Sequence, residues 1–222
     1  MTNDVFRSRL CHATLFLFLC WSHNGPLQAE DSLHHLVDAI QNRYNAIHSF
    51  SAGFTQIYRS GFSEEQESGI VYMKKPGKMR WEYTNPTIKL FVGDGKRTYF
   101  YVPRDKQVTI AEWSPDSAST PLLFLLGQGN LQRDFDVAEA AKEPKLAGGD
   151  TILILTPKTE QSSFKEVVLE VRRVDAGILR LSIVEHNENR NDYLLRSFRA
   201  NVPIADEKFR FKIPKGVEVI RQ

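Results

Sequence analysis

The stretch from Val71 to Pro86 constrains the fold more than any other part of the chain. A proline-glycine turn signal, Pro76-Gly77, opens an alternating run that ends at Pro86. Apolar or aromatic side chains occupy every second position of this run: Met79, Trp81 and Tyr83. Charged side chains stand between them: Lys78, Arg80 and Glu82. Such alternation predicts a half-buried antiparallel strand, whose apolar face belongs either to a solid core or to a binding surface.

The first thirty residues have the pattern of a secretory signal peptide. Two arginines, Arg7 and Arg9, precede an apolar run from Leu10 to Trp21, and the breaker pair Gly25-Pro26 follows. The run is about a dozen residues long, whereas a membrane-spanning helix needs about 20. We therefore predict that residues 1–29 are cleaved and that residues 30–222 form a single domain.

The cysteines support export in soluble form. Both of them, Cys11 and Cys20, lie inside the segment predicted to be removed. A lipid-modified Cys20 is the alternative, but Phe18 and Leu19 stand where that modification requires small residues. We therefore expect a soluble protein of the periplasm. With a formal net charge of +2, the chain gives no electrostatic case for binding nucleic acid.

The remaining chain is one amphipathic helix followed by short strands and tight turns. Apolar residues recur at helical spacing from Ser32 to Ile47, and the period changes to two at Phe50. Ser60 to Ser68 is predicted to be a polar hairpin connection. No crossover helix separates the strands up to Glu112, so they are expected to form an antiparallel meander. Besides the run after Gly77, the predicted strands are Phe50–Tyr58, Gly69–Lys74, Thr87–Val92, Arg97–Val102, Gln107–Glu112, Thr151–Thr156, Glu166–Arg173, Ile178–Glu185, Asp192–Ala200 and Lys208–Ile213.

The segment from Trp113 to Asn130 breaks this pattern. Ser119 and Thr120 can cap a short helix that has Pro121 in its first turn. The apolar run from Leu122 to Leu126 gives this helix no polar face, so it must cover, or be covered by, other apolar groups. Residues 134–142 fit either a helical turn or a strand.

Common catalytic and metal-binding motifs are absent from the sequence. It contains no G-x-S-x-G and no H-E-x-x-H, and the predicted mature chain has no cysteine nucleophile. His34, His35 and His48 lie on or near the first helix without other ligands at metal-binding spacing. We therefore expect a protein that is not an enzyme and that needs no cofactor or metal.

Several strings, taken in order along the chain, resemble the outer-membrane lipoprotein carrier (LolA) family. They are MKKPGKMRWEYTNP, LFVGDGKRTYFY, TPLLFLL, LTPK and KFRFKIPKGVEV. The resemblance implies an α+β fold, an unclosed antiparallel β-barrel of about 10–11 strands with a helical lid over a hydrophobic cavity. It also implies a monomeric chaperone that takes lipoproteins, by their acyl chains, from an inner-membrane ABC transporter to an outer-membrane acceptor.

The alternating strands and the apolar helix supply the candidate cavity lining. These residues are Phe54, Met79, Trp81, Tyr83, Leu90, Phe100, Leu122, Leu123, Phe124 and Leu126. Solid core is the other interpretation for each of them, because the family resemblance does not fix which face a side chain takes.

Lys75 occupies a position where the resemblance implies an arginine that latches the lid of the empty carrier. Lysine offers three donors but lacks the planar fork of arginine, so a weaker or differently placed latch is expected. A solvated turn lysine is the other interpretation.

The alternative function is a periplasmic lipid- or lipoprotein-sensing module on the same fold. A basic and aromatic surface for nucleic acid is disfavoured, because strand alternation sends Arg80 and Trp81 to opposite faces.

Overall fold

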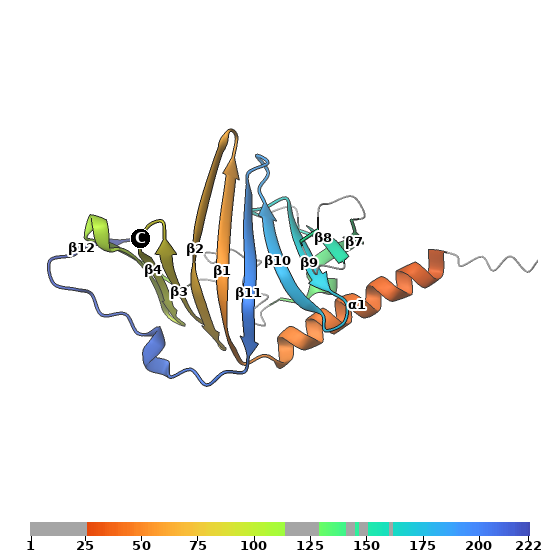
Figure 1. Cartoon of the computed structure of the whole chain (residues 1–222), viewed down its shortest axis with the longest axis horizontal. Helices are drawn as coiled ribbons and strands as arrows, with labels where there is room; N and C mark the ends of the chain where they lie inside the picture. The colour runs from red at the N-terminus through yellow and green to blue at the C-terminus, as the bar shows by residue number, and fades with distance from the viewer. Residues whose placement is uncertain (1–25, 114–128, 141–144, 147–150, 160–161) are drawn as a thin grey trace, which may run out of the picture.

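The computed structural model describes residues 26–113, 129–140, 145–146, 151–159 and 162–222. In this part of the chain, one open sheet of 12 strands is packed against a long helix, α1 (Pro26–Ala46). Figure 1 shows the sheet as a curved wall, with α1 running across one end of the strands β9, β10 and β11. The fold is therefore the predicted unclosed, mainly antiparallel sheet of an α+β protein.

The strand order is β12-β6-β5-β4-β3-β2-β1-β11-β10-β9-β8-β7. Every neighbouring pair is antiparallel except β12 and β6, which run parallel. The strands are β1 (Ser49–Ser60), β2 (Ser63–Lys74), β3 (Lys78–Asn85), β4 (Lys89–Asp94), β5 (Arg97–Val102), β6 (Gln107–Glu112), β7 (Phe135–Glu139), β8 (Thr151–Pro157), β9 (Glu166–Arg172), β10 (Gly177–Val184), β11 (Arg190–Ala200) and β12 (Glu218–Arg221). Short helical turns are η1 (Pro103–Asp105), α3 (Leu131–Asp134) and η2 (Asp206–Phe209). The predicted meander is confirmed from β1 to β6.

Three predicted boundaries or elements are wrong. The first helix begins at Pro26 rather than Ser32, because proline suits a first turn and the intervening residues are mostly good helix formers. The expected polar connection is short, because β2 already begins at Ser63 and its first, polar residues pair with β1 as an exposed hairpin. Lys208–Ile213 is not a strand. It pairs with no neighbour, and the last strand is β12 instead. The open choice for residues 134–142 resolves into α3 followed by β7.

Two predictions remain largely untested by the described residues. The predicted signal peptide lies mostly outside them, and so does the predicted helix after Pro121.

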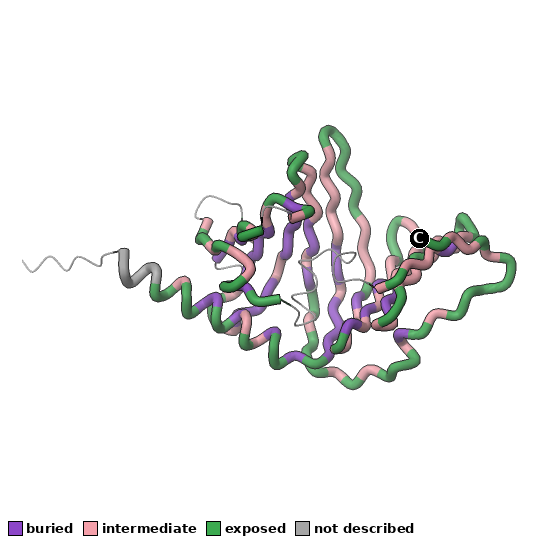
Figure 2. The backbone as a smooth tube through the Cα atoms, turned by 180° about the vertical axis from the view of Figure 1, so that it is seen from behind, coloured by how far each residue is buried: buried purple, intermediate pink, exposed green. Residues whose placement is uncertain are grey.

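The inner face of the sheet is defined here as the face that carries Phe54, Trp81 and Tyr193. Pairing places these residues on one side, because directly opposed side chains of neighbouring strands share a face. Apolar residues of α1, such as Ile40 and Tyr44, join the same buried cluster. Figure 2 shows the buried backbone concentrated in the middle strands and along one side of α1. The core therefore lies between α1 and the inner face.

The outer face carries Lys74 of β2 and the charged side chains of β3, and the C-terminal segment, residues 201–217, docks on it. Glu82 Oε1 lies 2.9 Å from Lys208 Nζ and 2.6 Å from Arg80 Nε. Burial pushes the pKa of Glu82 upward, but these hydrogen bonds outweigh it and the pKa is lowered. Buried Phe209 anchors the segment, and Phe211 packs on Tyr99 and Tyr101. The alternation of this segment thus reflects docking on a sheet face rather than strand pairing.

Gly69 provides a test of how closely the strands pack at a bulge. The β2–β3 register shifts between Ser68 and Gly69, and a Cβ at Gly69 would lie 1.9 Å from the backbone oxygen of Glu82. Gly69→Ala should therefore destabilise the protein by more than about 1 kcal/mol in urea unfolding. Gly53→Ala on the adjacent strand is the control, because its nearest contact would be an ordinary 3.7 Å. Equal stability of the two variants would contradict this packing.

Asp206 makes docking of the C-terminal segment sensitive to acid. Hydrogen bonds from Lys74, at 2.7 Å, and from Lys78 lower the pKa of Asp206 from 3.8 to about 2. A lowered pKa stabilises the docked state above about pH 4, and this stabilisation is lost as the pH falls towards about 2. The protection of amides in residues 201–210 against hydrogen exchange, relative to the intrinsic rate at each pH, should fall over this interval. Asp206→Asn should already exchange fast at about pH 7, and a variant that matched the parent protein would contradict the assignment.

Candidate functional site

Four aromatic rings and Gly69 form the centre of the inner face. Phe54 and Tyr83 both pair with Gly69, which has no side chain, so their rings approach to 5.0 Å between centroids. Phe54 also meets Trp81 edge-on at 4.8 Å. The Trp81 ring in turn lies 5.6 Å from that of Tyr193 on β11. The two halves of the sheet therefore meet in one aromatic contact.

The predicted lining residues of the first strands lie together. Phe54, Met79 and Trp81 are at most 4% exposed and belong to the same apolar cluster, against which Tyr83 packs. Phe100 shares this face, because it pairs with Phe91 and Phe91 pairs with Trp81, but it is 38% exposed and outside the cluster. The predicted residues Leu122, Leu123, Phe124 and Leu126 lie outside the described residues.

Leu90 does not lie on the inner face, in contrast to the prediction. It pairs with Glu82 and Tyr101, which places it on the outer face. Its neighbour Phe91 faces inward and packs against the cluster. Both positions in the sequence are apolar, so alternation alone could not fix the phase of β4. Only the β3–β4 register, which opposes Phe91 to Trp81, decides between them.

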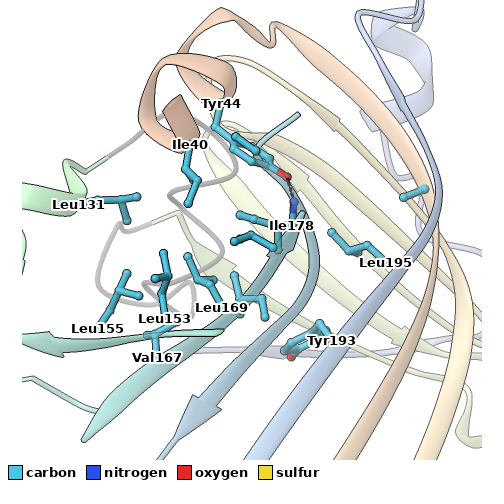
Figure 3. Packing of buried hydrophobic residues seen from close by; sticks show 14 of the residues in the cluster. Ile40, Tyr44, Leu131, Leu153, Leu155, Val167, Leu169, Ile178, Tyr193 and Leu195 are labelled. Carbon is cyan, nitrogen blue, oxygen red and sulfur yellow. Dashed lines mark hydrogen bonds between the residues drawn. The ribbon is translucent and has the colours of Figure 1, made fainter. Parts of the chain in front are cut away.

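Sequence reasoning missed the second half of the inner face. It is contributed by β8 to β11 and consists of Leu153, Leu155, Val167, Leu169, Leu181, Tyr193 and Leu195. Figure 3 shows several of these side chains converging beneath Ile40 and Tyr44 of α1. Only β8 is apolar on both faces in the sequence. On β9, Val167 and Leu169 alternate with Glu166 and Glu170, so periodicity does identify the inward positions there.

The polarity of the inner face changes along the strands. On β1, Phe50 and Phe54 near α1 are followed by Gln56 and Tyr58 towards the hairpin. On β2, the change is from Met73 to Glu67. Lys89, opposite Tyr83 on β4, forms an ion pair with Glu67. The inner face is thus apolar at the α1 end and polar at the hairpin end.

A hydrogen-bonded chain of four side chains crosses the polar end. The Tyr83 hydroxyl donates to Gln56 Oε1 at 2.9 Å, and Gln56 Nε2 donates to Asn191 Oδ1 at 3.1 Å. Asn191 Nδ2 then donates to the Tyr193 hydroxyl at 3.0 Å. Burial raises the pKa of Tyr193 to about 12 and also raises that of Tyr83. Both phenols therefore keep their protons at neutral pH.

Lys75 holds the C-terminal end of α1. Its Nζ donates to the backbone oxygens of Tyr44 at 2.6 Å and of Asn45 at 3.2 Å. A cation suits this position, because the last carbonyls of a helix carry partial negative charge. Burial lowers the pKa of Lys75. The contact joins the turn before β3 to the helix over the inner face.

Two further contacts fix the same end of α1. The Ile178 backbone N–H donates to the Tyr44 hydroxyl at 3.1 Å, and Arg43 Nη1 donates to the Asp175 carbonyl at 3.0 Å.

Within the described ranges, no cluster of three His, Cys, Asp or Glu residues could hold a metal. No helix described here is long and apolar enough to cross a membrane. The arrangement is an apolar surface under a tethered helix.

Comparison with known proteins places this arrangement in a family. Residues 45–212 match the family model described as "Outer membrane lipoprotein carrier protein LolA". The chain belongs to the LolA family. It is 29% identical over 210 residues to the outer-membrane lipoprotein carrier protein of Legionella pneumophila strain Paris, covering 94% of this chain and 98% of that protein. It is also 34% identical over 183 residues to the carrier of Klebsiella pneumoniae strain 342, covering 81% and 85%.

A solved structure supports the fold of this LolA-family chain. An uncharacterized conserved protein from Thermus thermophilus matches with a TM-score of 0.52 at 16% identity, covering 86% of this chain and 99% of that one. The names of the sequence relatives describe carriers rather than enzymes, in agreement with the prediction.

Proposed function

We propose that this protein is a periplasmic chaperone that binds the acyl chains of lipoproteins on its inner face. It receives lipoproteins from an inner-membrane ABC transporter and delivers them to an outer-membrane acceptor, acting as a monomer. Family membership supports this proposal, because its relatives are named outer-membrane lipoprotein carriers.

The single observation that carries the proposal is the continuous apolar inner face. Aromatic and aliphatic side chains from both halves of an open sheet meet there, centred on Phe54, Trp81 and Tyr193. Burial is worth about 0.8 kcal/mol per methylene, so several long acyl chains exposed to water would cost tens of kcal/mol. A carrier must therefore offer such a surface during transit.

The inner face is closed in this structure. Phe54 and Met79 are each 2% exposed, so acyl chains can reach this surface only if existing contacts open. The α1 helix packs over the face. Its C-terminal end is held by three contacts: Lys75 with the Tyr44 carbonyl, Ile178 with the Tyr44 hydroxyl, and Asp175 with Arg43. We assign Lys75 the role of a latch that favours this closed, cargo-free state.

Adjacent residues on β4 give a matched test of the binding face. Phe91 points inward and Leu90 outward, and both are partly buried. Phe91→Lys should weaken binding of a fluorescent diacylated lipopeptide about ten-fold or more, because an ammonium group among acyl chains is poorly solvated. Leu90→Lys should change the affinity less than about two-fold, since outer-face charges remain near water. Circular dichroism melts verify that both variants fold.

Equal losses in the two folded variants would contradict binding on the inner face. Native mass spectrometry of the protein isolated from the periplasm adds an independent check. A carrier is found with lipoprotein, whereas co-isolation with free lipid or a regulatory protein instead would favour a sensing module.

The latch is tested by its effect on release. Lys75→Leu removes both hydrogen bonds from the Lys75 ammonium group to α1, and a charge-assisted hydrogen bond is worth roughly 1.5 to 3 kcal/mol. The open state should gain population, so this variant should bind lipoprotein at least as well and transfer it more slowly to acceptor membranes. Lys75→Arg should transfer faster than Lys75→Leu. Lys96→Leu, at an exposed turn, is the control. Identical transfer times for all four proteins would reduce Lys75 to a structural turn residue.

A further inference from the structure

The four-residue chain on the inner face leaves one phenolic O–H outside its three links. Two phenols stand at its ends and two amides between them, and each link consumes one donor hydrogen. In this arrangement the Tyr193 hydroxyl accepts from Asn191, and its own proton makes no hydrogen bond among the residues described; the nearby Glu67 carboxylate is paired with Lys89. If both amides were reversed, the same count would leave the Tyr83 proton. Either way, one phenolic O–H remains.

Both end phenols lie where the apolar surface stops. Tyr193 is 6% exposed and belongs to the apolar cluster, and Tyr83 packs against that cluster. Figure 3 shows Tyr193 at the opposite end of the cluster from Tyr44 of α1. A buried hydrogen-bond donor without an acceptor lowers the stability of the protein, unless a ligand or water accepts from it. The feature therefore calls for an acceptor at the boundary of the apolar surface.

We propose that the Tyr83–Gln56–Asn191–Tyr193 chain binds a carbonyl oxygen at the root of the cargo's acyl chains. This inference rests on the function proposed above and adds an orientation to it. The acyl tails run towards α1, where Phe50 and Met73 line the inner face, and the ester groups lie at the Tyr83–Tyr193 end. The linked peptide then leaves past the polar hairpin end.

The chemistry of the cargo fits this polarity gradient. Ester carbonyls accept hydrogen bonds but donate none, so a phenolic O–H is a suitable partner. Raised pKa values keep both phenols protonated, so the donor persists at neutral pH. The bound carbonyl also excludes a reversed orientation, because reversal would place apolar chain ends against Gln56 and Asn191.

The test compares two synthetic lipopeptides of equal chain length. One carries two ester-linked acyl chains on its glyceryl group, and the other carries ether-linked chains without carbonyls. The parent protein should bind the ester form about five-fold more tightly, the worth of one neutral hydrogen bond. In the double variant Tyr83→Phe/Tyr193→Phe the two affinities should become equal. Tyr101→Phe, on the outer face, is the control and should keep the preference.

The outcomes separate this inference from the proposed function. Equal binding of both lipopeptides by the parent protein overturns the carbonyl site but leaves the carrier function intact, and this comparison needs no variant. An ester preference that survives in the folded double variant also overturns the site. Failure to bind either lipopeptide overturns the carrier function itself. Melting curves establish that the phenylalanine variants are folded.

Discussion

The register between neighbouring strands is the constraint on which the rest of the structure depends. Because strand side chains alternate, one pairing decides which residues face α1 and which face outward. The pairing of Val71 with Trp81, and of Trp81 with Phe91, collects the aromatic residues on the inner face. The same pairing sends Arg80 and Glu82 outward, where they hold the C-terminal segment. A slip of one residue would exchange an apolar surface for a charged one.

Among the described residues, α1 is held on the inner face by apolar packing of residues such as Ile40 and by polar contacts at its C-terminal end. Lys75 reaches the last carbonyls of α1, and Tyr44 receives one backbone N–H from β10. Individual hydrogen bonds of this kind contribute about 1 to 3 kcal/mol each, whereas burying a long acyl chain is worth several times more. Under the proposed function, cargo would displace these contacts, and their re-formation would favour its departure.

The sequence predicted most strands well, but it did not reveal which residue faces inward where neighbouring residues are both apolar. Arg97–Val102 and Gln107–Glu112 agree with β5 and β6 at both ends. Leu90 was assigned to the wrong face, because Leu90 and Phe91 are both apolar. Lys208–Ile213 alternates like a strand, but it docks on a sheet face and leaves its backbone unpaired with any strand.

Long-range pairing explains what the sequence could not reveal about the site. Gln56 and Asn191 are separated by 135 residues and meet only because β1 pairs with β11. The family resemblance left Lys75 either as a lid latch or as a solvated turn lysine, and its acceptors on Tyr44 and Asn45 required the packed structure.

Tryptophan quenching by brominated acyl chains tests the central claim most directly. In the chain from Glu30 onward, Trp113→Phe leaves Trp81 as the one tryptophan, and Trp81 lies on the inner face. A diacylated lipopeptide with bromine at mid-chain should quench Trp81 fluorescence on binding, whereas the unbrominated lipopeptide should not. Saturable binding with no extra quenching by the brominated lipopeptide would place the acyl chains elsewhere and contradict the account.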